Sequence, residues 1–307
     1  MRILLTGASG AIGSQLAPEL VGEGHELRAL ARDPARVTVS GIGEIFRGDV
    51  LTADGLAEAL SGVDLAYYLV HSMEPSADAE SFADRELRSA TNFADAARSA
   101  GVRRVCYLGG LVPADRAPSQ HLASRLAVEE TLLESAPEAV ALRASIVISA
   151  ESRSFRFLVR LLERSPLLPL PDWRDFRTQP IDGRDVVAYL KAAGLSAAVE
   201  GRLVLDIAGP DSVTYGQLIQ RIADAMMLGR PALELPFSIT PVASVVAASI
   251  AGESNELVGP LMAGLSGDLL ADDAAARQLF NVRLHRLDNA ISNALREWEE
   301  TEPLAAR

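Results

Sequence analysis

The stretch that decides the fold is residues 1–16, MRILLTGASGAIGSQL. Arg2 to Thr6 is a short apolar run without polar alternation, which predicts a strand buried on both faces. Three glycines then follow at intervals of three residues: Gly7, Gly10 and Gly13. The next segment, residues 15–21, has the composition of a helix. A strand, a glycine-rich turn and a helix N-terminus together favour an anion, because backbone N–H groups and the helix dipole both attract negative charge there.

Each glycine has a separate predicted task in that turn. Gly7 permits the tight turn, Gly10 lets the backbone approach a pyrophosphate, and Gly13 lets the helix pack close to the strand. The alternative is an ordinary strand-to-helix turn that is rich in glycine. The residues predicted to line the pyrophosphate site are Gly7, Ser9, Gly10, Ala11, Ile12 and Gly13.

Strands and helices alternate through the first half of the chain. Strands are expected at 26–31, 43–47, 64–70, 102–108 and 139–148, with helices at 54–60, 79–100 and 119–135. Such alternation with short turns predicts an α/β fold with a doubly wound parallel sheet. We expect residues 1–150 to form a dinucleotide-binding domain. Residues 151–307 are expected to form a smaller, mainly helical lobe, partly interwoven with the first and closing over the carboxyl edge of the sheet.

The strand at 26–31 ends in Arg32 and Asp33. At this place an acidic side chain binds the 2′-hydroxyl of the adenosine ribose, whereas an arginine accommodates a 2′-phosphate. Arg32 lies nineteen residues after Gly13, about the expected distance. We therefore expect NADP(H) rather than NAD(H). The alternative is that Arg32 is a solvated loop charge and Asp33 binds the ribose.

Two other strand ends supply candidate cofactor contacts. After the strand at 43–47, Asp49 and Val50 are placed to lie near an adenine amino group. After the strand at 64–70, Leu69, Val70 and His71 are expected at the carboxyl edge, where ligands bind in such sheets. His71 either lines the crevice or is a structural histidine.

Composition excludes several classes of partner. The chain has 307 residues, 49% of them hydrophobic, a net charge of −12 and no basic run, which argues against nucleic acid and anionic membranes. Its single cysteine, Cys106, allows no intramolecular disulfide and suits a reducing compartment. Met1 leads directly into a predicted strand, so no signal peptide is expected.

We expect a cytoplasmic protein that binds a small molecule, with no metal site. Apolar helices in the last third make a homo-oligomer possible.

Four segments carry a family resemblance: residues 6–13, Arg32-Asp33, Gly48-Asp49-Val50, and Arg177-x-Gln179-Pro180-Ile181 followed by Asp185-Val186. With them the chain resembles the atypical or extended short-chain dehydrogenases/reductases, and most closely their NmrA-like, NAD(P)H-binding branch. The resemblance implies a Rossmann-type domain and a nicotinamide cofactor.

The sequence departs from that family where the chemistry is done. The standard enzymes place a Ser after the fifth strand and a Tyr-x-x-x-Lys on the next helix. Here the fifth strand ends in Gly109-Gly110, and none of the five tyrosines lies four residues before Lys191, the only lysine. The Tyr-x-x-x-Lys pattern is therefore absent from the chain.

The matching helix carries His121 and Arg125, which are four residues apart and share a helical face. Arg125 can replace the lysine as a cation that binds ribose hydroxyls, but it does not give up a proton. His121 is the candidate proton donor, with an ordinary pKa near 6.5 that a nearby arginine would lower. The alternative is a surface histidine beside a cofactor-anchoring arginine.

The sequence therefore predicts an NADPH-dependent reductase of a carbonyl, a quinone or an activated alkene. His71 or Ser72 would contact the substrate, and Trp173 and Phe176 are candidate pocket walls. Two alternatives stay open. One is an epimerase-like enzyme that retains its cofactor, and the other is a non-catalytic NADP(H)-binding redox sensor or regulator of the NmrA type.

Overall fold

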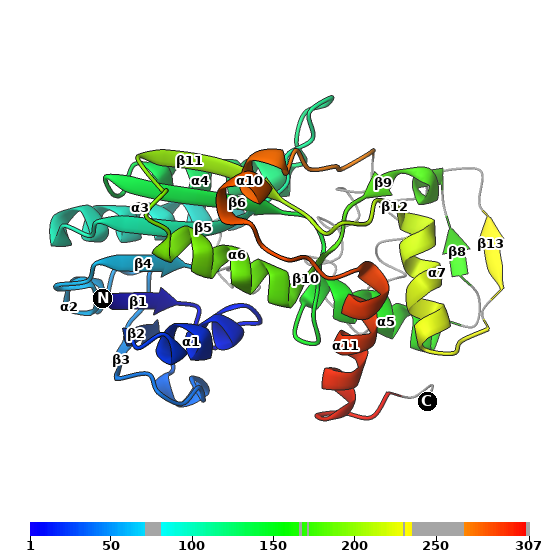
Figure 1. Ribbon diagram of the computed structural model, residues 1–307, viewed down its shortest axis with the longest axis horizontal. Coiled ribbons are helices and arrows are strands. Elements are labelled where there is room, and N and C mark those ends of the chain that lie inside the picture. The colour runs from blue at the N-terminus through cyan, green and yellow to red at the C-terminus, as the bar shows by residue number, and fades with distance from the viewer. Residues whose placement is uncertain (71–80, 166–167, 171, 230, 235–266, 305–307) are drawn as a thin grey trace.

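The computed structural model describes residues 1–70, 81–165, 168–170, 172–229, 231–234 and 267–304. Its centre is a seven-stranded sheet with helices on both faces, and a group of helices lies beyond the carboxyl ends of the strands (Figure 1). The strand order is β11-β6-β5-β4-β1-β2-β3, and every neighbouring pair is parallel. This order confirms the predicted doubly wound sheet, with the reversal of strand order between β1 and β4.

The strands lie where the apolar runs predicted them. Their bounds are β1 Arg2–Thr6, β2 Glu26–Ala31, β3 Glu44–Arg47, β4 Leu65–Tyr68, β5 Arg104–Gly110, β6 Glu138–Ala144 and β11 Arg202–Ile207. The central strands β1, β4 and β5 are almost entirely buried, as expected for strands covered on both faces. The expected strand at 139–148 is divided, because β6 ends at Ala144 and the separate strand β7, Val147–Ile148, pairs with β10, Ile181–Asp182.

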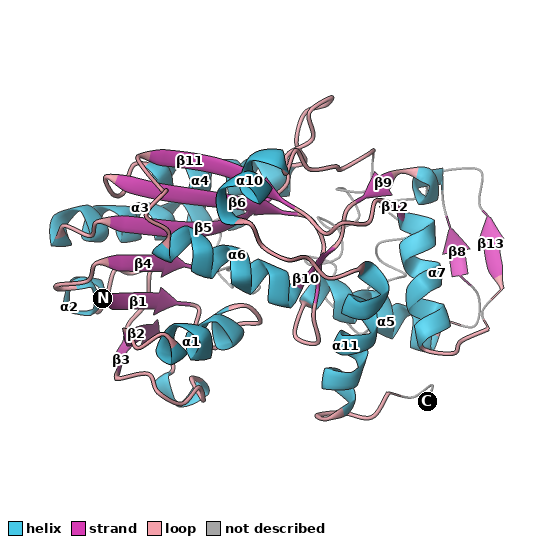
Figure 2. Ribbon diagram, viewed as in Figure 1, coloured by secondary structure: helices cyan, strands magenta, loops and turns pink. Residues whose placement is uncertain are grey.

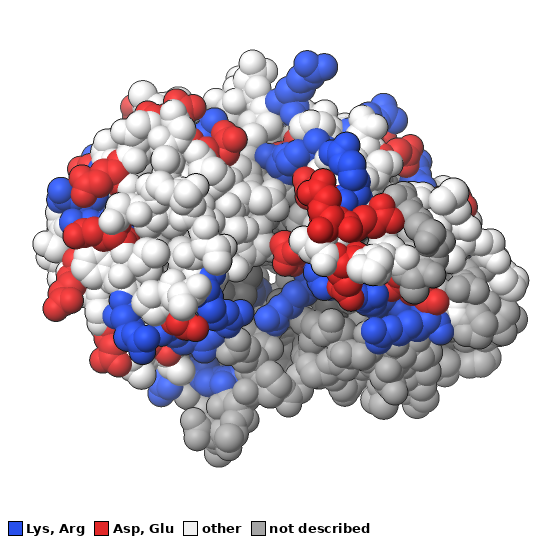
Figure 3. All heavy atoms as spheres, turned by 90° about the horizontal axis from the view of Figure 1, so that it is seen from below, with Lys and Arg blue, Asp and Glu red and all other residues white. Residues whose placement is uncertain are grey.

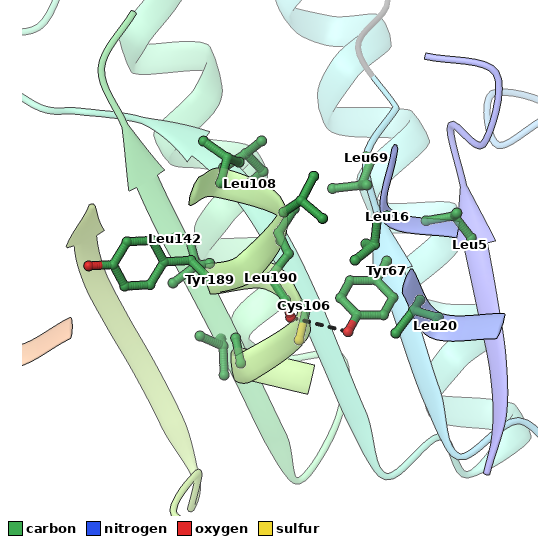
Figure 4. Close-up of a cluster of buried hydrophobic side chains, with 14 of the residues drawn as sticks. Leu5, Leu16, Leu20, Tyr67, Leu69, Cys106, Leu108, Leu142, Tyr189 and Leu190 are labelled. Carbon is green, nitrogen blue, oxygen red and sulfur yellow. Dashed lines mark hydrogen bonds between the residues drawn. The ribbon is translucent and has the colours of Figure 1, made fainter. Parts of the chain in front are cut away.

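Helices cover both faces of the sheet (Figure 2). The side chains of α1 (Gly13–Gly22) and α6 (Gly183–Leu195) enter one core, and those of α2 (Leu56–Leu60), α3 (Phe82–Ala100) and α4 (Gln120–Leu133) enter the other. Figure 4 shows the first core, where the Tyr67 hydroxyl donates to the Leu190 carbonyl over 3.1 Å. This bond holds α6 against β4 and fixes the position of the helix along the strand.

A second group of helices builds a core of its own. It consists of α5 (Arg153–Arg164), α7 (Tyr215–Ala225) and α11 (Leu287–Glu299), packed around the buried Trp298. The guanidinium groups of Arg156 and Arg160 lie 4.3 and 5.0 Å from the ring centre of Trp298. Short strands complete this part: β8 Leu168–Leu170, β9 Arg177–Thr178, β12 Val213–Thr214 and β13 Ala232–Glu234.

The late part of the chain crosses between the two groups. Helix α6 and strand β11 return to the central sheet, as does α10 (Ala274–Phe280), whose Ala276 enters the first core. In this late part, α10 and α11 are helical, and residues 267–273 and 281–286 lie outside helices. Across the described ranges no helix is both long and apolar enough to cross a membrane.

Candidate functional site

The turn after β1 can be formed only by glycine at two of its positions. Gly7 has a φ of +76°, and a β-carbon there would lie 2.6 Å from the Leu69 carbonyl oxygen. A β-carbon on Gly13 would lie 2.1 Å from the Gly7 carbonyl oxygen. Gly10 is less constrained, with that same oxygen at 3.2 Å, and its N–H closes the turn on Gly7 over 2.9 Å. The backbone therefore forms a cradle that side chains would fill.

The cradle opens at the N-terminus of α1. No side chain caps this helix, and the N–H groups of residues 14–16 donate to the carbonyls of Gly10 and Ile12. Ser9 and Gly10 are exposed, whereas Ala11 and Ile12 are half-buried and Gly13 is buried. The positive end of the helix dipole at this open turn favours an anion such as a diphosphate. The residues present thus fit the pyrophosphate of a dinucleotide.

Thr6 ties β1 to β4 at the point where the strand order reverses. Its hydroxyl donates to the Tyr67 carbonyl over 3.0 Å and accepts from the Leu69 N–H over 3.2 Å. Leu69 and Val70, both predicted cofactor contacts, consequently lie beside the glycine turn. The other two candidates at this strand end, His71 and Ser72, lie outside the described residues.

Arg32 and Asp33 differ in their surroundings at the end of β2. One carboxylate oxygen of Asp33 accepts the Ala35 N–H over 3.1 Å and so caps the short helix Pro34–Arg36. Arg32 and Asp33 are both exposed, and which of them meets the adenosine ribose stays a prediction.

Asp49 and Val50 lie in the loop after β3, which two contacts hold in place. The Asp49 carboxylate accepts the Leu51 N–H over 2.9 Å. From α3, the Asn92 amide donates to the Val50 and Leu51 carbonyls over 3.0 and 2.9 Å. Sequence reasoning missed Asn92, because an asparagine within a helix carries no local sign of a partner 41 residues earlier.

Arg125 on α4 is buried and makes an ion pair. It donates to the Glu86 carboxylate on α3 over 3.3 Å and to the Leu108 carbonyl on β5 over 3.0 Å, and it lies 5.5 Å from the Tyr107 ring centre. The other Glu86 oxygen accepts the Ser124 hydroxyl over 2.9 Å. This arrangement joins two helices and a strand. The predicted ribose contact of Arg125 stays a prediction beside this structural role.

His121 lies in the first turn of the same helix, with its ring 6.0 Å from that of Phe82 on α3. Burial, and then the charge of Arg125, lower the pKa of His121 to about 4. The imidazole is therefore neutral at pH 7. In that state it can donate a hydrogen bond from its ring N–H, but it holds no extra proton to release.

The two predicted pocket walls have separate positions. Trp173 is buried in the core of the second helix group, where it meets the Tyr215 ring edge-on at 6.3 Å. Phe176 is exposed. Figure 3 shows a hollow between the two parts of the molecule, with basic side chains on both sides of it. No cluster of metal-ligating side chains occurs among the residues that the structure describes.

Two hydroxyl groups that sequence reasoning missed meet beyond β6. The Ser145 and Thr178 hydroxyl oxygens are 2.9 Å apart. Their sequence positions are 33 residues apart, and no motif links them.

Comparison with known proteins identifies the family. Residues 7–147 match the sequence profile of an NAD(P)H-binding family. The chain is 30% identical over 235 residues to the (4-alkanoyl-5-oxo-2,5-dihydrofuran-3-yl)methyl phosphate reductase of Streptomyces griseus, covering 75% of this chain and 74% of that protein. It is 26% identical over 236 residues to the ceramide reductase of Caulobacter vibrioides, covering 76% and 73%.

Solved structures of NAD-binding proteins have the same fold as this chain. A short-chain dehydrogenase/reductase superfamily protein from Agrobacterium tumefaciens with bound NAD superposes with a TM-score of 0.70 at 18% identity, over 98% of both chains. The UDP-glucuronic acid 4-epimerase of Bacillus cereus in complex with NAD gives 0.73 at 16% identity, over 98% of this chain and 97% of that one. The chain belongs to the NAD(P)H-binding family, and it shares its fold with these NAD-binding proteins.

Proposed function

We propose that the protein is an NADPH-dependent reductase of a small molecule, acting on a carbonyl, a quinone or an activated alkene, with the activated alkene favoured. The observation that carries this proposal is the chemistry of α4. Where the family's standard enzymes hold a tyrosine and a lysine, this helix presents a neutral histidine and an arginine already bound to Glu86. Such a site offers hydrogen bonds but no strongly acidic group among the residues described.

Weak donors suit one kind of reduction better than another. Bound NADPH supplies a hydride. Hydride addition to a simple ketone leaves a basic alkoxide, which needs a proton at once. Addition to a C=C bond conjugated with a carbonyl leaves an enolate, whose charge is shared between oxygen and carbon. Neutral donors aimed at the enolate oxygen are then sufficient, as with neutral histidines that polarise carbonyl groups elsewhere.

The Streptomyces griseus relative supports the same choice, because its named substrate is a dihydrofuran that bears oxo and alkanoyl groups. The test is to titrate the protein with NADPH and NADH by nicotinamide fluorescence and then to follow loss of NADPH absorbance with enones, quinones, aldehydes and ketones. We expect turnover of enones above that of simple ketones. Turnover confined to simple ketones would contradict the preference.

The preference for NADPH is part of the proposal and is supported by Arg32. A charge-assisted hydrogen bond from arginine to phosphate contributes roughly 1.5–3 kcal/mol, which is about 10- to 100-fold in affinity. Arg32→Ala is expected to weaken NADPH by that factor and NADH far less. Arg98→Ala, at the exposed end of α3 where the arginine pairs with Asp95, is the matched control. Equal losses for the two cofactors in Arg32→Ala would rule out this role.

A second candidate, a non-catalytic NADP(H) sensor of the NmrA type, is supported by the same commitment of Arg125 to Glu86. Binding of NADPH without turnover of any acceptor would favour it over the reductase. Cys106 does not supply a thiol sensor, since it is fully buried and burial raises its pKa to about 12. The expected homo-oligomer and cytoplasmic location stay predictions.

A further inference from the structure

We propose that Asn92 on α3 is a positioning residue that makes the cofactor site selective for adenine. It holds the loop after β3 so that the Asp49 carboxylate faces the amino group of the base. This proposal rests on the proposed NADPH-dependent function, of which it needs the binding of the cofactor and not the turnover.

The loop of residues 48–55 lies at the end of the sheet where we expect the adenosine. It follows β3, and the Gly48 N–H donates to the Ala31 carbonyl at the end of β2 over 3.1 Å. Strand β2 lies between β3 and β1, and the glycine turn after β1 is the expected diphosphate site. In a doubly wound sheet the ligand lies outside the carboxyl ends of the strands. We therefore expect the adenine that is joined to this diphosphate to lie beside the loop.

The two ends of the loop are joined through their backbone. The Asp49 N–H donates to the Asp54 carbonyl over 3.0 Å. A β-carbon on Gly48 would lie 2.2 Å from that same carbonyl oxygen, so the two ends meet closely. Val50 and Leu51 lie between these contacts, and their carbonyl groups are held from α3.

Asn92 uses both protons of its side-chain amide on this loop. The amide nitrogen donates to the Val50 carbonyl over 3.0 Å and to the Leu51 carbonyl over 2.9 Å. Two neighbouring carbonyl oxygens thus converge on one nitrogen, which holds the chain bent at this point. The Val50 side chain enters the same core as Phe93, the next residue of α3. The loop and the helix are therefore joined by polar and apolar contacts together.

The peptide group between Val50 and Leu51 transmits the effect of Asn92 to Asp49. This peptide bond is trans, so its C=O and N–H point in opposite directions. Because the Val50 carbonyl points at α3, the Leu51 N–H points away from that helix and donates to an Asp49 carboxylate oxygen over 2.9 Å. The half-buried Asp49 carboxylate consequently lies on the side of the loop opposite to α3.

A carboxylate held in this way distinguishes one purine from another. It accepts hydrogen bonds and donates none, and its two oxygens offer about four acceptor positions, of which the Leu51 N–H takes one. The amino group of adenine is a donor. Hypoxanthine carries an oxygen in that place, which a carboxylate repels. Without Asn92 the peptide group between residues 50 and 51 is free to turn, and Asp49 loses its direction toward the base.

The first experiment compares the Kd values of NADPH and deamino-NADPH, in which hypoxanthine replaces adenine, by nicotinamide fluorescence. A hydrogen bond to a charged group corresponds to about 10- to 100-fold in affinity, and we expect the wild type to favour NADPH by that factor. Asn92→Leu has a similar shape but no donor. It should lose most of this difference, mainly through weaker NADPH binding. Asn92→Ser, which places no apolar group against the loop, should do the same.

Asn293→Leu is the matched control. It makes the same change at a half-buried asparagine of α11, whose amide donates to the Glu297 carboxylate over 2.8 Å. This variant should retain the preference of the wild type for NADPH. A loss of stability alone would weaken both dinucleotides by the same factor, so the ratio of the two Kd values separates a positioning role from a structural one.

A second experiment reverses the preference. In Asp49→Asn the carboxamide oxygen can still accept the Leu51 N–H, and its NH₂ group then faces the base. We expect this variant to bind deamino-NADPH more tightly than NADPH. Adding Asn92→Leu should abolish the reversed preference, because both residues act through one peptide group and their effects are not additive.

The outcomes separate this proposal from the proposed function. An unchanged ratio of Kd values in Asn92→Leu and Asn92→Ser would overturn the role of Asn92, and so would a wild type that binds the two dinucleotides equally. Both results leave the proposed function standing, because the cofactor still binds. A wild type that binds neither form would overturn the proposed function and this proposal with it.

Discussion

The two halves of the carboxyl edge of the sheet differ in the groups that form their sites: backbone in one half and side chains in the other. The half at β1 to β3, where we expect the adenosine, is built from backbone: a turn of glycines, an uncapped helix N-terminus and a loop held by Asn92. The half at β4 to β6, where we expect the nicotinamide, depends on side chains from distant segments, with Glu86 on α3, Arg125 on α4 and Ser145 paired to Thr178.

This difference has a physical basis. A diphosphate is recognised by amides and a helix dipole, which any sequence able to form the turn supplies. A reacting group needs particular side-chain atoms at particular places, and substitutions there change the chemistry while the fold stays the same. The comparison therefore predicts that substitutions in the first half lower the affinity for the cofactor. Substitutions in the second half should change either folding stability or turnover, depending on the residue.

The largest expected effect is at Gly13. A β-carbon there would lie 2.1 Å from the Gly7 carbonyl oxygen, and both atoms belong to backbone that cannot move independently. Gly13→Ala should abolish measurable NADPH binding by fluorescence titration and lower the melting temperature. Gly22→Ala, in the same helix with nothing within 4 Å of the added carbon, should bind NADPH normally and be neutral or slightly stabilising. Normal binding by Gly13→Ala would show that the cradle does not have this geometry.

The next largest effect is expected at the pair of Glu86 and Arg125, whose side chains are 4% and 9% exposed. Glu86→Leu leaves a buried guanidinium without its counter-charge and should cost about 3–5 kcal/mol in urea unfolding. The double variant Glu86→Leu/Arg125→Met replaces the pair by apolar groups and should recover most of that loss. NADPH affinity of the double variant should change little if the pair is structural. A large loss of affinity would instead establish the ribose contact of Arg125.

The same contrast explains how far the sequence alone could be interpreted. The glycine spacing, the apolar runs and the cap residues are local signals, so the doubly wound parallel sheet and the tight glycine turn were predictable from them. The division of the 139–148 strand was not, because Val147 and Ile148 pair with β10, more than 30 residues later.

The side-chain chemistry of the second half was predictable only in part. His121 and Arg125 could be selected by their spacing on one helix face. Glu86 could not, since nothing in its own segment shows that a cation from α4 neutralises it, and the Ser145–Thr178 contact joins two residues with no shared motif. Burial could not be predicted from the spacing either. It is the largest cause of the low pKa of His121, and the charge of Arg125, which the sequence singles out, is the second.

The smallest expected effect follows from that low pKa. The folded protein holds His121 neutral down to about pH 4, whereas in the unfolded chain the group takes a proton near its ordinary pKa of about 6.5. Between these values the unfolded state binds more protons, so stability rises with pH. The contribution of His121 to the free energy of unfolding is therefore complete above pH 6.5. It is lost as the pH falls toward 4, by on the order of 2–3 kcal/mol.

Urea unfolding at pH 7 and pH 5 measures this loss of stability in acid. The loss should be smaller for His121→Gln than for wild type or for His25→Gln, which removes a histidine from the turn between α1 and β2. Equal acid losses in all three proteins would place His121 in water and return it to the role of an ordinary proton donor.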